Sequence, residues 1–186
     1  MATSLMELVP ELSLREREAL LQAAGEHVLE FGCGGSTVML LAHGHRVTSI
    51  ESDPEWVRKV NAATSGHDRL NLRRVDIGPV GRFGAPASVK SSPRWASYWR
   101  AADDIEPDTV FVDGRFRVAC AINAALHWNV PILLHDFNLS RRPAYAELPQ
   151  LLTLVDVVGH LATFRRPSAW PAGLWLALAR YAADWC

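Results

Sequence analysis

Short apolar runs that alternate with helix-like segments constrain the fold of this chain more than any other feature. Runs rich in Val, Ile, Leu and Phe cover residues 27–31, 46–50, 70–75, 108–112 and 130–134. Segments with helical periodicity lie between them, at residues 37–43, 54–64 and 117–128, and Asp53 and Pro54 have the residue types of an N-cap and first helical position for the second. Neighbouring parallel strands need crossover connections, and strands buried on both faces are apolar along their whole length. The pattern predicts an α/β fold with a doubly wound, mostly parallel sheet and helices on both faces.

The two ends of the chain complete this arrangement. Ser13 followed by Glu16 has the spacing of a capping box, so we expect residues 1–25 to form a helical segment that ends near Gly25. Two further apolar runs, 154–164 and 173–181, are separated by a loop that contains Arg and Pro. They predict a C-terminal antiparallel hairpin and a total of seven strands.

The length and composition indicate one domain over residues 1–186. No apolar run reaches the roughly 18 residues of a membrane span, and a net charge of -1 gives no general attraction for nucleic acid. The three cysteines are an odd number without CxxC spacing, which fits reduced thiols in a cytoplasmic protein. The sequence does not indicate an oligomeric state.

Residues 77–107, an irregular insert followed by a helix, are the candidate acceptor-binding region.

The segment VLEFGCGGSTVML, residues 28–40, is the strongest functional signal. Glycines at positions 32, 34 and 35 are expected where the backbone needs a positive φ or a close approach to another group. Ser36 and Thr37 are placed to cap the following helix. In an open α/β sheet, ligands bind beyond the carboxyl ends of the strands, where this turn should lie.

Two acids, Glu51 and Glu30, indicate which class of ligand this turn binds. Glu51 ends the second strand, 19 residues after Gly32, where a carboxylate can accept hydrogen bonds from both hydroxyls of a ribose. The dinucleotide fingerprint G-x-G-x-x-G is not met, because Thr37 stands at its third glycine. Glu30 would repel a diphosphate but suits a ligand with an ammonium group. S-adenosylmethionine is such a ligand.

These residues resemble the class I S-adenosylmethionine-dependent methyltransferases over roughly residues 25–180. Residues 30–34 resemble their motif I, and Glu51 matches their ribose-binding acid. Asp76 resembles the acid that contacts the adenine amino group, and Asp113 matches the motif beside the transferred methyl. The segment LLHDF, residues 133–137, resembles the end of their fifth strand. The implied cofactor-binding residues are Glu30, Gly32, Cys33, Gly34, Gly35, Ser36, Thr37, Glu51, Ser52 and Asp76.

Three side chains are candidates for acceptor binding or general-base catalysis. Asp113, His135 and Asp136 lie at the ends of adjacent predicted strands, so we expect them to converge; ordinary turn formation is the alternative for the two acids. Catechol-type methyltransferases bind a divalent cation with acids at these strand ends and an adjacent Asn. Here Asn138 is two positions past Asp136, so no metal is predicted. Arg115 and Arg117 either hold an anionic acceptor or are surface charges at a helix start.

The resemblance implies methyl transfer from S-adenosylmethionine to a small-molecule acceptor. Few residues lie outside the core, which leaves little chain to form a large acceptor site. Two alternatives stay open at this point: a methyltransferase-like domain that binds without catalysis, and a nicotinamide-dependent oxidoreductase. No signature of a particular subfamily is present.

Overall fold

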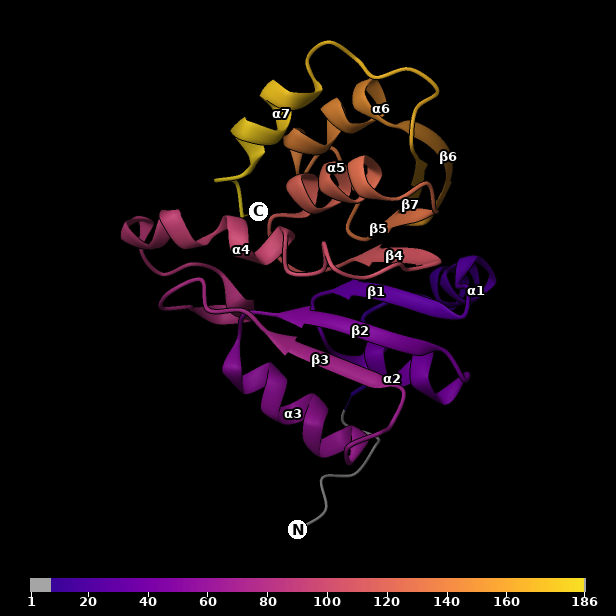
Figure 1. Cartoon of the computed structure of the whole chain (residues 1–186). Coiled ribbons are helices and arrows are strands. Elements are labelled where there is room, and N and C mark those ends of the chain that lie inside the picture. Colours follow the sequence, from indigo (N-terminus) through magenta and orange to yellow (C-terminus); the bar gives the residue numbers. More distant parts are fainter. Residues whose placement is uncertain (1–7, 186) are drawn as a thin grey trace.

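A computed structural model describes residues 8–185 and contains a seven-stranded sheet in the order β3-β2-β1-β4-β5-β7-β6 (Figure 1). Strands β1 to β5 are parallel, and β7 is antiparallel to both β5 and β6. The predicted fold class is confirmed. The strands are β1 His27–Phe31, β2 Arg46–Glu51, β3 Leu70–Arg74, β4 Thr109–Val112, β5 Ile132–Leu134, β6 Thr153–Val158 and β7 Leu161–Arg165.

Helices cover both faces of the sheet. Along β1, Val28 packs in one core cluster with α1 and α2, whereas Leu29 and Phe31 pack in the other with α4, α5 and α7. Successive strand side chains point to opposite faces, so Glu30 lies on the same face as Val28. The helices are α1 Leu14–Ala23, α2 Gly35–Ala42, α3 Pro54–Thr64, α4 Ala96–Trp99, α5 Arg117–His127, α6 Leu148–Leu151 and α7 Leu174–Tyr181. None of the helices within residues 8–185 has the length and apolar character of a membrane span.

Two helix starts follow from local sequence. At α1 the Ser13 hydroxyl accepts from the Glu16 N–H at 3.4 Å, and the Glu16 carboxylate accepts from the Ser13 N–H at 2.7 Å. Asp53 caps α3 by accepting from the Glu55 N–H, with Pro54 at the first helical position. Both caps are as the sequence predicts.

The C-terminal hairpin lies in a different place from the one predicted. Both of its strands fall between residues 153 and 165, with the turn at Gly159, where φ is +61°. Residues 174–181, expected as a strand, form α7 and bury Leu174, Ala177, Leu178 and Tyr181. These positions have the i, i+3, i+4, i+7 spacing of a helical face, which our strand assignment overlooked.

The irregular insert packs against the sheet on one side and lies beside the glycine turn on the other. It contains two short 3-10 helices, Arg82–Gly84 and Val89–Arg94, and then α4. Trp95 and Tyr98 are buried against Phe116. Its function as the acceptor-binding region stays a prediction.

Candidate active site

Two of the three glycines in the turn make room for the protein's own backbone. A Cβ at Gly32, where φ is +96°, would lie 2.6 Å from the Gly114 backbone, and one at Gly35 would lie 2.4 Å from the backbone of Val9 and Pro10. A Cβ at Gly34 would meet nothing within 4 Å. Of the three, Gly34 therefore faces the open space that a ligand can enter.

Glu30 lies underneath this turn. It is fully buried, and its carboxylate accepts hydrogen bonds from the hydroxyls of Ser36, Thr37 and Ser49 at 2.5, 2.5 and 2.7 Å. Thr37 Oγ1 also accepts from the Gly34 N–H at 2.9 Å, so Glu30 fixes the turn through Thr37. Burial raises the pKa of Glu30 to about 7, and the three hydroxyls oppose that rise. The side chain does not line the cavity at the turn, and the predicted contact with the cofactor remains a prediction.

Replacing Glu30 with Gln is expected to increase stability relative to the wild type at pH 8 more than at pH 5. A carboxyl group whose pKa is raised from 4.5 to about 7 stabilises the fold fully below about pH 4.5, and this stabilisation is lost as the pH rises through 7. The shift corresponds to roughly 3 kcal/mol, which a neutral amide does not lose. Urea unfolding of both proteins at pH 5 and pH 8 measures the difference, with Glu18→Gln, at an exposed position, as the control. A difference that is independent of pH would contradict this account of Glu30.

Glu51 connects the end of β2 to the glycine turn. Its carboxylate accepts from the backbone N–H groups of Cys33, Ser52 and Asp53 at 3.2, 2.6 and 2.7 Å. Burial raises its pKa, although these three hydrogen bonds lower it. Burial, followed by the charge of Glu51, also raises the pKa of the Cys33 thiol, so Cys33 is a packed thiol rather than a nucleophile.

A cavity of about 270 Å³ opens over the turn and is lined by Gly34, Glu51 and Asp113. Trp56 and Phe83, which the sequence analysis did not identify, also line it. Trp56 lies on the first turn of α3, five positions after Glu51. Its closeness in sequence to this strand-end acid could have identified it as a cavity residue. Residues 8–12 close another side of this cavity. They lie about 20 residues before the glycine turn in the sequence, and no local pattern indicates that they pack against it.

Asp76 lies away from this cavity. Its carboxylate accepts from the Gly78 N–H at 2.9 Å and pairs with Arg94 at 2.9 Å, and the side chain is exposed. Ser52 is buried, and its hydroxyl donates to the Gly84 carbonyl at 3.3 Å. Contact of either side chain with a cofactor therefore remains a prediction.

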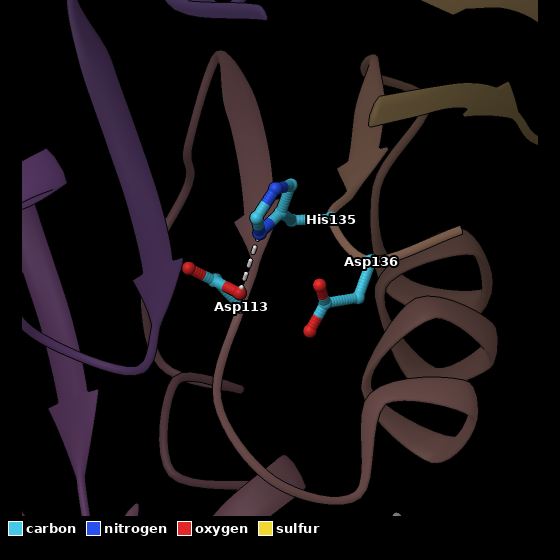
Figure 2. A group of neighbouring side chains, drawn as sticks. All are labelled: Asp113, His135 and Asp136. Atoms are coloured by element: carbon cyan, nitrogen blue, oxygen red, sulfur yellow. Dashed lines mark hydrogen bonds and ion pairs between the residues drawn. The ribbon is translucent and has the colours of Figure 1, made fainter. Parts of the chain in front are cut away.

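Asp113, His135 and Asp136 do converge at the carboxyl ends of β4 and β5 (Figure 2). Their ligand atoms lie within 4.8 Å of one another, and His135 Nδ1 is 3.0 Å from Asp113 Oδ1. Burial acts to lower the pKa of His135, but the hydrogen bond and charge of Asp113 raise it above the ordinary value. His135 is therefore held as a donor to Asp113.

Arg117 supplies the positive charge at this cluster. Its buried guanidinium lies 3.1 Å from both Asp113 Oδ1 and Asp136 Oδ2. It also donates to the carbonyls of Asp113, Gly114 and His135 at 3.0, 3.0 and 2.7 Å. The surface-charge alternative is wrong for Arg117, because its side chain is buried and its N–H groups are used in these contacts; contact with a methyl acceptor stays a prediction.

The same contacts bear on the metal alternative. Arg117 already balances the two carboxylates that a divalent cation would need, and Asn138 Oδ1 accepts from the N–H groups of Ser140 and Arg141. The site within residues 8–185 is therefore organised around a guanidinium. The absence of a metal stays a prediction.

The fold is that of a class I methyltransferase. A solved methyltransferase-like protein from Silicibacter pomeroyi DSS-3 is 33% identical, with a TM-score of 0.83, and the match covers 95% of this chain and 98% of that one. The chain belongs to the class I S-adenosylmethionine-dependent methyltransferases. This decides against the nicotinamide alternative.

Two further comparisons are more distant. Fibrillarin from Aeropyrum pernix, solved with natively bound S-adenosyl-L-methionine, shares the fold with a TM-score of 0.52 at 14% identity, over 78% of this chain and 67% of that one. Ribosomal RNA small subunit methyltransferase A from Anaeromyxobacter sp. strain K is 37% identical over 81 residues. That stretch is 39% of this chain and spans only 28% of the Anaeromyxobacter protein. No family model matches the chain.

Proposed function

We propose that this protein transfers the methyl group of S-adenosylmethionine to a small-molecule acceptor. The supporting observation is the pairing of the cavity at Gly34 and Glu51 with the Asp113–Asp136 cluster beside it. In this proposal Gly34, Glu51 and Trp56 hold the cofactor, which supplies an electrophilic methyl on a sulfonium. This site offers open space at Gly34, a buried carboxylate and an aromatic ring. These groups fit an adenosine that carries a methionine group.

We assign Asp113 and Asp136 to orientation of the acceptor. Each carboxylate faces Arg117 at 3.1 Å, and Asp136 has a second arginine, Arg142, at 3.3 Å. Burial raises the pKa of Asp136, but Arg117, His135 and Arg142 lower it below the ordinary value, so it is a weak base. Transfer then depends on alignment of the nucleophile more than on removal of its proton. His135 is not among the residues that line the cavity at Gly34 and Glu51, and we assign it to positioning Asp113.

An RNA acceptor is the second candidate function. The 37% identity over 81 residues to a ribosomal RNA methyltransferase favours it. The net charge of -1 argues for the small molecule, since RNA-binding surfaces carry an excess of basic residues.

Calorimetric titration with S-adenosylmethionine, S-adenosylhomocysteine and NADH tests the cofactor assignment. We expect micromolar binding of the first two, weakened at least about 10-fold in Gly34→Val, because the added side chain fills the open space. Gly173→Val is the matched control, since its Cβ also meets nothing within 4 Å. Cofactor affinity unchanged by Gly34→Val would overturn this placement.

Transfer of a labelled methyl group tests the acceptor. The labelled cofactor is incubated with the protein and either a small-molecule extract or ribosomal RNA. Label in low-mass products supports the proposal, whereas label in RNA favours the second candidate. Cofactor binding without transfer to either would indicate the non-catalytic alternative.

A further inference from the structure

A second cavity, of about 470 Å³, lies on the far side of the Asp113–Arg117–Asp136 cluster. Asp136, Asn138, Arg141, Arg142, Tyr145 and His160 are among its lining residues. Arg117 lines the first cavity and contacts Asp136, which lines the second. The two cavities therefore share this cluster as a wall, and their sizes suit small ligands.

Tyr145 lines this second cavity, and its hydroxyl is an unsatisfied group. Tyr145 is fully buried, and its hydroxyl oxygen has no hydrogen-bond partner among residues 8–185. Burial raises the pKa of Tyr145, and the positive charges of Arg117 and Arg142 oppose the rise. The hydroxyl therefore stays protonated at neutral pH and is a donor. A buried polar group without a partner costs free energy, which a bound ligand can recover.

Two arginines at this cavity have donors that are not used within the described chain. The guanidinium of Arg141 is exposed and takes part in no ion pair or hydrogen bond found within the described chain. Arg142 uses only Nη2, at 3.3 Å from Asp136. Three acceptors of this cavity have partners: Asp136 pairs with Arg117 and Arg142, Asn138 Oδ1 accepts from two backbone N–H groups, and Asp184 has an interaction of its own.

We infer that this second cavity binds an oxyanion, a carboxylate or a phosphate, carried by the methyl acceptor. Arg141 and Arg142 hold the oxyanion through forked hydrogen bonds, and the Tyr145 hydroxyl donates to it or to the adjoining part of the acceptor. The acceptor's reacting atom then lies toward Asp136 and the first cavity. This inference rests on the proposed function, because it assumes that the ligand of the second cavity is the acceptor.

Titration of the full chain with benzoate and with inorganic phosphate, in the presence of saturating S-adenosylhomocysteine, tests the inference. The Nε–Hε signals of the arginines in ¹H–¹⁵N spectra report binding, and the two probes distinguish a carboxylate site from a phosphate site. We expect saturable millimolar binding of at least one probe, weakened about 10-fold or more in Arg141→Gln. Arg58→Gln, an exposed change on α3, is the matched control.

Tyr145→Phe gives an independent measurement. The variant should unfold at the same or a higher urea concentration than the wild type, since it loses an unpaired buried hydroxyl, yet bind the anion several-fold more weakly. A destabilised variant with unchanged anion affinity would show that the hydroxyl has a structural function only.

Three outcomes would overturn the inference: no binding of either probe, binding that is unaffected by Arg141→Gln, or binding that competes with S-adenosylhomocysteine. The cofactor titration is read separately. If the wild type does not bind S-adenosylhomocysteine, the proposed function is contradicted, and the anion titration still shows whether the second cavity binds an oxyanion.

Discussion

Replacing Glu51 with Gln is expected to weaken binding of S-adenosylhomocysteine about 100-fold. A neutral amide loses the charged acceptor that we assign to the ribose hydroxyls, and two such hydrogen bonds contribute about 3 kcal/mol. In the unliganded protein the same carboxylate accepts from the N–H groups of Cys33, Ser52 and Asp53. An amide nitrogen in place of either oxygen would face at least one of these donors and shift the turn.

Calorimetry on the variant measures the loss. Glu18→Gln changes an exposed acid on α1 and serves as the control, with affinity expected to equal that of the wild type. Urea unfolding of Glu51→Gln separates a defect in the site from a defect in the fold. If the folded variant bound S-adenosylhomocysteine within about threefold of the wild type, the assignment of Glu51 to the ribose would be wrong.

Replacing Arg117 with Met is expected to lower the free energy of unfolding by about 3–5 kcal/mol. The buried guanidinium contacts two carboxylates and three backbone carbonyls. Methionine fills much of the volume but leaves Asp113 and Asp136 without the cation that balances them. The three buried backbone carbonyls also lose their donor, and this loss adds to that of the carboxylates, whose side chains are 27% and 44% exposed.

Urea denaturation at pH 7 measures this change. Arg15→Met, at an exposed position of α1, is the matched control and should change stability by less than about 0.5 kcal/mol. Arg117→Lys keeps the charge without the fork and should recover only part of the loss. A loss below about 1 kcal/mol in Arg117→Met would mean that water or rearrangement satisfies the two carboxylates.

Much of the fold was predictable because its signals are local. The apolar runs located strands β1 to β5, and the Ser13–Glu16 and Asp53–Pro54 patterns located the starts of two helices. The strand prediction for residues 174–181 failed because a short apolar run fits both a strand and a helix. Only the core around α7 decided between them, through burial on one helical face.

Sequence spacing by itself determined the glycine turn, Glu51 at the end of the second strand, and the meeting of Asp113, His135 and Asp136, since parallel strands end at the same edge of a sheet. The tertiary structure alone decided what these groups contact. It put three hydroxyls from two elements on Glu30, Arg94 on Asp76, and Arg117 between the two acids. Such contacts depend on which distant segments pack together and on how deeply a charge is buried, and no local pattern encodes either.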